Sequence, residues 1–542
     1  MNVKLYPEFY NDVFGPISNP GSSSHMSGPC RAGYLAHTLL GEDVKSIDIK
    51  IDKSGSFGEG LGQMNEDIGM LNGAYGKLPD AENFFEIKDI LNSKNISFSF
   101  EFGSLTESDH PNAMKFHLTG RSGKKITLVV NSTGGGMVET VAVNGIRFSG
   151  KGDSWVILIF DTDPEDNKYA QKIKDIVKRE YEVLTSGDSF ERAEGAENPA
   201  GFKRLLWFCL EERPDIELIR KESPKKEVFL MEPVLPVITS ARKKPQRYST
   251  FKEWRELAAK EGKSLYETAV EYEMDASGWS REKVEDHMKS IILKALKRRI
   301  SALYEDESLL MKNPYRIIYH REWENATRKS LLVNGITQKA IRYMLSAQAS
   351  MNGVLDIPGP MSNGAGYLFS VLTAVKEEYG LDDEALIRGL FVAASVGAIA
   401  YTQTEPTGEI IGCAGECGVC AAMTAAAIVE MLGGTPEEIE NAASFTLQSA
   451  IGWPCDPIPG GQGTPCTSRT LFIVSMPQVY AQWALMGAIC VVPFDEVLDT
   501  VDKVGRSLSS DLLCTLRGGL CATCSGRECA KAFREDRKRA KN

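Results

Sequence analysis

The sequence predicts an α+β domain over residues 1–150, a small α/β unit with a linker over 151–246, and an all-α, cysteine-rich domain over 247–542. Three observations support this fold class. Apolar and polar residues alternate in the first 150 residues, as they do in half-buried strands. From about residue 247 onward apolar residues recur at helical spacing. Only Cys30 and Cys209 precede residue 413, so ten of the twelve cysteines belong to the helical part.

The amino-terminal domain is predicted to contain one early helix and four strands. The segment "PGSSSHMSGPCRAGYLAHTLL" runs from a Gly/Ser/Pro loop into a helix, with Ser24 or Ser27 as its N-cap. Four later segments alternate as strands do: "SIDIKID", "ISFSFEF", "KFHLTG" and "KITLVVNS". The "STGGG" at 132–136 predicts a turn at which backbone can approach a ligand closely.

The middle unit and the carboxy-terminal domain differ in their periodicity. Between 151 and 240, "SWVILIF" and "EVFLMEPVLPV" predict strands and "DNKYAQKIKDIVKREY" predicts a helix, while the basic, proline-broken "ARKKPQRYS" predicts a linker. The later segments predict helices, among them "GAGYLFSVLTAVKEEYG" and "CGVCAAMTAAAIVEMLGG". The "TPEE" before another amphipathic run predicts a capped helix start with proline at its first position.

Composition and charge exclude several classes of protein. The net charge of −11 disfavours a nucleic-acid partner, because such a partner requires many phosphate-neutralising cations. The start "MNVKLYPEFYND" has no basic and apolar leader, and the apolar run "GLFVAASVGAIAY" is too short to span a bilayer. We therefore expect a cytoplasmic protein with no membrane partner, in which a disulfide framework is improbable.

The segment "EIIGCAGECGVCAAM" contains Cys413, Cys417 and Cys420 in the C-x3-C-x2-C spacing of radical S-adenosylmethionine enzymes. Two features disfavour radical chemistry: helical sequence follows the motif, and Cys417 and Cys420 fall within an Ala-rich helical stretch. Close helix packing is the favoured interpretation of Cys417, Cys420 and Cys490. All six histidines precede residue 413, so a metal site in this region would use sulfur ligands, which suit zinc or an iron–sulfur cluster.

Three cysteines lie instead on predicted loops. Cys413 follows the turn-rich "TEPTGEIIG" and precedes a helix, where a thiolate is stabilised. Cys455 and Cys466 both neighbour prolines in "GWPCDPIPGGQGTPCTSRT". Three thiolates would leave one iron of a [4Fe–4S] cluster without a protein ligand, and an open iron can act as a Lewis acid.

These motifs resemble the iron–sulfur-dependent L-serine dehydratase family with its β and α modules fused. "GCAGECGVCAAMTAAAIVEMLGGTPEEIENA", "CDPIPGGQGTPC" and "GGLCATCSGRE" resemble the α module, and "GSSSHMSGP", "HPN" at 110–112 and "STGGG" resemble the β module. The resemblance implies a catalytic helical domain with a [4Fe–4S] cluster held by Cys413, Cys455 and Cys466. It implies that His25 and His110 transfer protons, although a structural hydrogen-bonding role is the alternative for each. The implied substrate-binding residues are Ser22, Ser23, Ser24, Ser362, Asn363 and Gly364.

The sequence departs from the family where substrate is held. The family's "LTGGDA" corresponds to "SLLVNGITQKA" at 330–340, its "PTAGxxG" to "PGPMSNGAG" at 358–366, and its "GHxTD" to "LGQMNEDIG", which lacks histidine. Changed polar contacts indicate a changed substrate. We therefore predict dehydration of 2-(hydroxymethyl)glutarate to 2-methyleneglutarate, as in a relative from anaerobic nicotinate fermentation. Lys339 or Arg342 would meet its second carboxylate, or be solvated helix charges.

Two alternatives remain at this point. The first is L-serine dehydratase activity, which yields pyruvate and ammonia. The second is a non-catalytic zinc or redox protein, in which the cysteines would bind metal without forming a substrate site. In either dehydratase the partner is a small hydroxy acid, and a homo-oligomer is compatible with the family.

Overall fold

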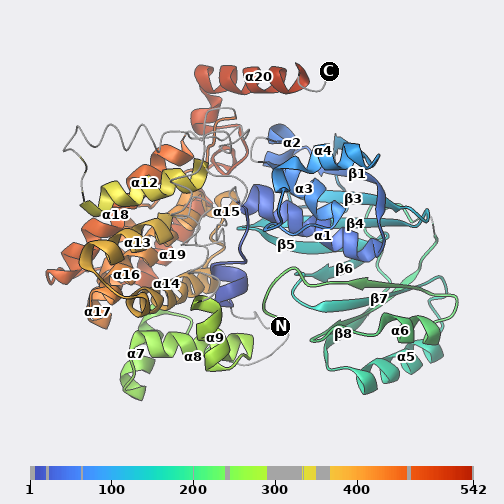
Figure 1. Cartoon of the computed structure of the whole chain (residues 1–542), viewed down its shortest axis with the longest axis horizontal. Helices are drawn as coiled ribbons and strands as arrows, with labels where there is room; N and C mark the ends of the chain where they lie inside the picture. The colour runs from blue at the N-terminus through green and yellow to red at the C-terminus, as the bar shows by residue number, and fades with distance from the viewer. Residues whose placement is uncertain are drawn as a thin grey trace. The chain divides into compact units, whose positions relative to one another are not determined.

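The computed structural model describes residues 7–19, 23–62, 65–198, 200–238, 245–289, 333, 335–349, 367–459 and 465–539 (Figure 1). The chain divides into two compact units. One is Ser24–Lys243, and the other combines Met1–Ser23 with Lys244–Asn542. The mixed α/β amino-terminal part and the helical carboxy-terminal part agree with the predicted fold class. The finer division into three domains stays a prediction.

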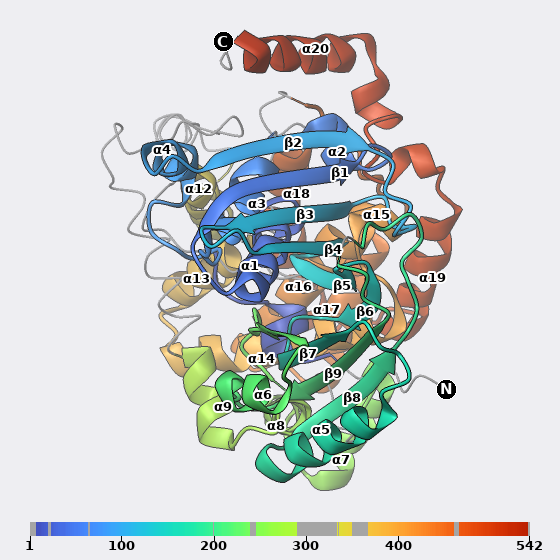
Figure 2. The ribbon, with the colours of Figure 1, turned by 90° about the vertical axis from the view of Figure 1, so that its right-hand side faces the viewer.

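The first sheet of the Ser24–Lys243 unit has six strands in the order β2-β1-β3-β4-β5-β6, which Figure 2 shows one below another. β1 and β2 are parallel and the other neighbours are antiparallel. The helices α1 and α3 pack against each other, and α1 also packs on β3, β4 and β5. The bounds are β1 Val44–Asp52, β2 Ser97–Gly103, β3 Ala113–Gly120, β4 Lys125–Gly134, β5 Met137–Val143, β6 Ile146–Gly150, α1 Gly28–Leu40, α2 Ser56–Gly60, α3 Glu66–Tyr75 and α4 Ile87–Ser93.

The alternating pattern of this sheet builds its core. Ile47, Ile49 and Ile51 of β1 are all buried, as are Phe116 of β3 and Leu128 of β4. Burying side chains of this size stabilises a fold by about 2 kcal/mol each. The four strands that the sequence predicted in this region are confirmed, and β5 and β6 extend the sheet beyond them.

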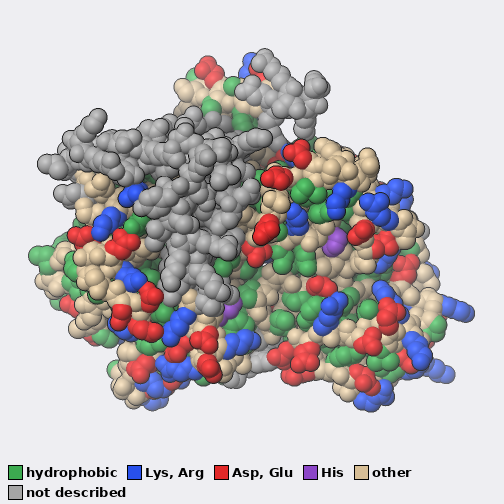
Figure 3. Space-filling model, in the orientation of Figure 1, with side chains coloured by type: hydrophobic (Ala, Val, Ile, Leu, Met, Phe, Trp, Pro, Cys, Tyr) green, Lys and Arg blue, Asp and Glu red, His purple; other side chains and the backbone are tan. Residues whose placement is uncertain are grey.

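The second sheet of the same unit has the order β10-β7-β9-β8 with every neighbouring pair antiparallel. Its elements follow as a β-α-β-β-α-β arrangement. α5 buries Ala170, Ile173 and Val177, and in Figure 3 basic and acidic side chains are intermixed over α5 and α6. The bounds are β7 Trp155–Asp161, α5 Asn167–Glu180, β8 Val183–Ser189, β9 Arg204–Leu210, α6 Ile216–Glu222 and β10 Glu227–Met231.

The named elements of the second unit are all helices among its described residues. α16 lies at its centre and packs against α13, α14, α17 and α18, because its alanines are small and fully buried. The predicted start of α17 is confirmed, with a capping box between Thr435 and Glu438 and Pro436 at the first position. The bounds are α7 Phe251–Glu261, α8 Leu265–Ser277, α9 Arg281–His287, α12 Gly335–Ala349, α13 Tyr367–Tyr379, α14 Asp383–Gln403, α15 Gly408–Ile411, α16 Val419–Met431, α17 Pro436–Gln448, α18 Cys466–Leu485, α19 Phe494–Ser507 and α20 Cys524–Arg539.

Within the described part of the chain, two segments, Asp383–Gln403 and Ala414–Met431, are long and apolar enough to cross a membrane. Of their most apolar stretches, 83% and 89% is buried inside the fold. Core helices of globular proteins have this composition, so the two segments are weak grounds for a membrane role.

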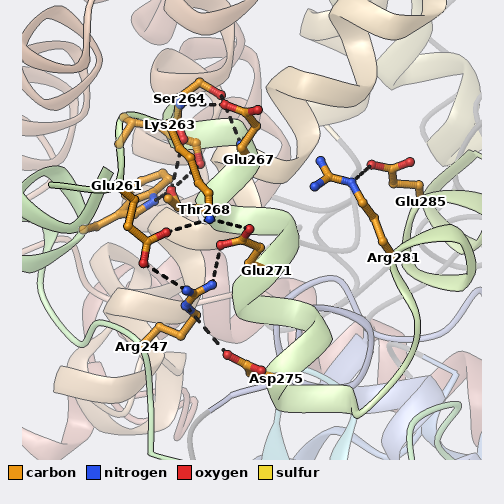
Figure 4. A network of polar contacts seen from close by, with 12 residues as sticks. Arg247, Glu261, Lys263, Ser264, Glu267, Thr268, Glu271, Asp275, Arg281 and Glu285 are labelled. Atoms are coloured by element: carbon orange, nitrogen blue, oxygen red, sulfur yellow. Dashed lines mark hydrogen bonds and ion pairs between the residues drawn. The ribbon is translucent and has the colours of Figure 1, made fainter. Parts of the chain in front are cut away.

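A charge network joins α7, α8 and the segment before them. Figure 4 shows Arg247 between Glu261, Glu271 and Asp275, with nitrogen–oxygen distances of 3.2, 2.5 and 3.7 Å. Lys263 adds ion pairs of 2.8 and 2.7 Å to Glu261 and Glu271. Several charges that share partners stabilise a fold more than an isolated surface pair does.

We expect Arg247→Met to lower the free energy of unfolding by about 1–2 kcal/mol, because it leaves three partly buried carboxylates around an empty position. The matched control is Arg281→Met, which removes one exposed pair to Glu285 and should cost under about 0.5 kcal/mol. Urea unfolding of both variants measures the difference. Equal losses would show that the network adds nothing beyond a single surface pair.

Candidate functional site

One candidate site is a group of cysteine side chains at the junction of three loops. The Cys413 backbone N–H donates to the Trp453 carbonyl at 2.9 Å, which ties the loop before α16 to the segment before α18. Cys455 pairs in turn with the loop after α19. Its N–H donates to Leu512 at 2.9 Å, and the Cys514 N–H donates back to Cys455 at 2.8 Å. Backbone pairing therefore brings Cys413, Cys455 and Cys514 together from three places in the chain.

Glycine is required at one point of this junction. Gly412 has a φ of +72°, and a Cβ there would lie 2.4 Å from the Trp453 carbonyl oxygen. A side chain would therefore clash with the very group that Cys413 binds. This close approach explains why glycine precedes Cys413 in "EIIGCAGECGVCAAM".

The thiols influence one another electrostatically. The Cys417 thiol lies 3.3 Å from the Cys413 sulfur, and this hydrogen bond lowers the pKa of Cys413, as does the nearby Arg469 guanidinium. The pKa of Cys455 is raised by a hydrogen bond with the Cys514 thiol, by burial, and by the charges of Cys514, Cys413 and Cys466. Cys413 is therefore the thiol of this group that is most readily deprotonated to a thiolate.

The donors of this group are thiols without imidazole, and the cluster that they are predicted to hold stays a prediction. Among the described residues, no three His, Cys, Asp or Glu side chains are grouped as ligands of one ion. Each protein ligand of a cluster binds a different iron, so cluster thiols need not converge on one point. Soft thiolates without imidazole are the usual ligands of iron–sulfur clusters.

The three predicted ligands differ in exposure. Cys413 is buried, Cys455 is half-buried, and Cys466 is exposed at the first position of α18. Their roles as ligands stay a prediction. Cys420 is fully buried and its pKa is raised to about 12 by burial, in keeping with a packing role. Cys417 contacts Cys413 and so has surroundings that the packing interpretation did not include.

Sequence reasoning missed three groups at this junction. Cys514 has a φ of +60°. It lies in a carboxy-terminal segment whose cysteine spacing matches no recognisable motif, so the sequence did not single it out. Arg469 forms an ion pair of 2.8 Å with Asp456, next to Cys455. Burial, the neighbouring Glu409 and Cys413 raise the pKa of Glu416 well above its usual range.

A second candidate site lies in the Ser24–Lys243 unit, around His25. Ser23–Ser27 forms a turn of π-helix that leads into α1, and His25 is 4% exposed. The His25 Nδ1 lies 3.0 Å from the Ser24 Oγ, and its Nε2 lies 3.0 Å from the Ser56 Oγ. Ser132 of the "STGGG" turn donates to the Ser24 carbonyl at 3.1 Å.

The hydrogen bonds around His25 indicate its tautomer. Ser56 Oγ donates its only proton to Asn112 Oδ1 at 3.1 Å, so it accepts from His25 Nε2–H. The Nδ1 lone pair then faces Ser24. Burial lowers the pKa of His25 to about 4, so the ring is neutral at pH 7 and Nδ1 is its basic atom.

His110 connects to the same network. The Asn112 N–H donates to His110 Nδ1 at 3.1 Å, and Asn112 Oδ1 binds Ser56, the partner of His25. The fit is tight, because a Cβ at Gly55 would lie 2.4 Å from that oxygen. His110 also lines a cavity of about 500 Å³ with Asn131, Glu139 and Arg147, and burial lowers its pKa.

Some predicted residues cannot be placed. Ser22, Ser362, Asn363 and Gly364 lie outside the described residues, while Ser23 and Ser24 are buried. Lys339, predicted to meet a second carboxylate, forms an ion pair of 3.1 Å with Glu378 on α13. That pairing favours its interpretation as a helix charge.

Comparison with known proteins gives one consistent result. The model of the family described as "Serine dehydratase alpha chain" matches residues 260–521. The chain is 39% identical over 172 residues to the probable L-serine dehydratase alpha chain of Bacillus subtilis. It is 29% identical over 291 residues to the L-serine dehydratase alpha chain of Peptoniphilus asaccharolyticus. It is 34% identical over 167 residues to the probable L-serine dehydratase alpha chain of Latilactobacillus sakei.

The extent of these matches differs. They cover 57%, 98% and 80% of those three relatives, and 32%, 53% and 31% of this chain. The family match includes all three predicted cluster cysteines and also Cys514. It begins beyond the Ser24–Lys243 unit, so the resemblance of that unit to a β module stays a prediction.

Proposed function

Since this chain belongs to the serine dehydratase family, a family of carbon–oxygen lyases, we propose that it is an iron–sulfur-dependent hydro-lyase acting on a 3-hydroxy carboxylate. The observation that supports the proposal is the junction of Cys413, Cys455 and Cys514 within the matched region, where the charge of Cys466 also acts on Cys455. A [4Fe–4S] cluster held by the predicted ligands Cys413, Cys455 and Cys466 would supply Lewis acidity toward the substrate hydroxyl.

The chain's own residues prepare the thiol junction for this role. The cation of Arg469 favours the thiolate form of Cys413, and the ion pair between Arg469 and Asp456 holds the guanidinium beside Cys455. The raised pKa of Glu416 favours its protonated form, and this carboxyl would supply a proton near Cys413, where a departing hydroxyl group would need one.

His25 is the best-supported base for the proton α to the carboxylate. Its Nδ1 carries the lone pair, its Nε2–H is fixed by Ser56, and Asn112 orients Ser56 in turn. A base fixed by a chain of buried hydrogen bonds loses little orientational freedom in the reaction. His110 belongs to the same chain through Asn112 and is proposed to position it.

L-serine is the substrate that the relatives favour, since each of them carries that substrate in its name. The loop differences make 2-(hydroxymethyl)glutarate the second candidate. Its case is weaker in the structure, because Lys339 is already paired with Glu378 and residues 358–366 lie outside the described chain. Both candidates share the β-hydroxy acid core.

Incubation of protein purified without oxygen separates the two substrates. L-serine should yield pyruvate and ammonia, whereas 2-(hydroxymethyl)glutarate would yield 2-methyleneglutarate. Pyruvate alone supports the proposal in full, and the methylene acid alone would transfer the activity to the second substrate. Iron without either product would contradict the hydro-lyase proposal.

The non-catalytic alternative makes a different prediction at Cys514. A redox protein would require four thiolate ligands, and Cys514, which is hydrogen-bonded with Cys455, is a candidate for the fourth. With three ligands, Cys514→Ser should retain the wild-type content of iron and sulfide, measured per chain after anaerobic purification. Loss of about a quarter or more of the iron would assign Cys514 to the cluster and favour the redox alternative.

The setting follows from the proposed chemistry. An iron open to a small substrate is also open to oxygen, so we propose an anaerobic cytoplasm. The partner is a small hydroxy acid, and a homo-oligomer stays a prediction.

A further inference from the structure

Arg31 is a buried cation that forms no close ion pair among the described residues, and Asp80 is the acidic group whose charge acts on it. It lies on α1, is 1% exposed, and takes part in no ion pair within the described chain. Its Nη1 donates to the Gly136 carbonyl at 2.5 Å, whereas its Nε and Nη2 have no hydrogen-bond partner there. Unpaired buried charges are costly, so they are retained where a ligand completes them.

The free donors of Arg31 have a specific geometry. Nε–H and one N–H of Nη2 lie parallel along one edge of the planar guanidinium, and the Gly136 bond uses the other side of the group. That edge matches the two oxygens of a carboxylate, which it binds through two parallel hydrogen bonds.

Ser27 supplies a third unpartnered buried donor on the same face of α1. It precedes Arg31 by one helical turn, so both side chains project from the same face of the helix. The Arg31 side chain also points back toward the helix start. Ser27 is fully buried, makes no capping bond, and its Oγ has no partner among the described residues.

The position adjoins the "SSSH" segment. Gly136, which accepts from Arg31, belongs to the same turn as Ser132, and Ser132 donates to the Ser24 carbonyl. A Cβ added at Gly28 would touch Ser132 and Gly136, so α1 and this turn are in close contact. Ser24 in turn lies beside His25 Nδ1.

We propose that Arg31 and Ser27 form the subsite for the substrate carboxylate, a role that rests on the hydro-lyase function proposed above. The carboxylate would lie across Nε–H and Nη2–H of Arg31 and accept a third bond from Ser27. This neutralises the buried cation and fixes the α carbon relative to the "SSSH" segment.

Binding of a substrate analogue tests the subsite without turnover. L-alanine keeps the carboxylate of L-serine but lacks the hydroxyl group that leaves, and L-alaninamide replaces the carboxylate with a neutral amide. Calorimetry on the anaerobically purified full chain should show L-alanine binding about 100-fold more tightly than its amide. Inorganic phosphate serves as a third probe. Phosphate bound as tightly as L-alanine would overturn the assignment to a carboxylate.

Three variants distinguish a carboxylate-binding role of Arg31 and Ser27 from a purely structural role. Arg31→Met should weaken L-alanine binding about 100-fold, Arg31→Lys about tenfold because it loses the paired edge, and Ser27→Ala severalfold. Arg179→Met, an exposed arginine on α5, is the matched control and should change nothing. If Arg31→Met does not fold, the lysine and alanine variants decide.

Unchanged L-alanine binding in the folded Arg31 and Ser27 variants would overturn the proposal and leave Arg31 as a support for the "STGGG" turn. This outcome is distinct from failure of the hydro-lyase proposal, which is read from iron and product. In an active enzyme, Arg31→Lys should also raise KM for L-serine more than it lowers kcat, as expected for a residue that binds the reacting ground state.

Discussion

Replacing Cys413 with alanine should abolish the dehydration of L-serine, with a loss of about a thousandfold or more. Metal-ion catalysis of this kind contributes several kcal/mol to the transition state, and all of it is lost if the metal is lost. Cys413 is the ligand candidate whose pKa is lowered, because its sulfur is hydrogen-bonded with that of Cys417 and the Arg469 guanidinium lies nearby. Iron and sulfide per chain should fall together with activity.

The matched control is Cys490→Ala. Cys490 is half-buried in the same helical unit, and its contact to Asn441 is made by its backbone N–H, which the substitution keeps. This variant should retain iron, sulfide and activity. A Cys413 variant with full activity, or a Cys490 variant without iron, would refute the assignment of the ligands.

His25→Gln should lower kcat for L-serine by about 10² to 10⁴-fold, the usual contribution of a general base. Glutamine can still bond to Ser56 but offers no lone pair of comparable basicity to Ser24. Because burial lowers the pKa of His25 to about 4, the neutral ring persists well below pH 6.5. The acid limb of the kcat/KM profile should therefore fall near pH 4, provided that the protein stays folded.

The control for this prediction is His117→Gln. His117 lies on β3 in the same unit, and its ring contacts Thr127 rather than the "SSSH" segment. That variant should keep both the rate and the pH profile. If the His25 variant kept wild-type kcat, another group would be the base. An acid limb near pH 6.5 would instead indicate a solvated histidine.

The strands of the two sheets show which parts of the fold could be predicted from the sequence. β5 and β6 were overlooked although "VAVNGIRF" contains a hairpin signal: Asn144 and Gly145 have φ values of +47° and +83°, as a tight two-residue turn requires. β8 could not have been found by pattern. "VLTSGDS" is polar and contains a glycine, and it forms a strand only because β9 offers it an edge.

The candidate site divides in the same way. Cys413, Cys455 and Cys466 could be selected because they are the cysteines on Gly/Pro-rich loops. Cys514 could not be, since its place beside Cys455 depends on backbone pairing across nearly sixty residues. Arg31 likewise looks like an ordinary helix charge in the sequence. That its Nε and Nη2 are buried without a hydrogen-bond partner among the described residues is a consequence of the packing around α1.

The most direct test of the central claim is Mössbauer spectroscopy of ⁵⁷Fe-labelled protein purified without oxygen, before and after addition of L-serine. Three protein thiolates leave one iron distinct from the rest. The account predicts a four-iron spectrum in which L-serine shifts the signal of a single iron. A protein without iron, or four irons that are all indifferent to L-serine, would contradict it.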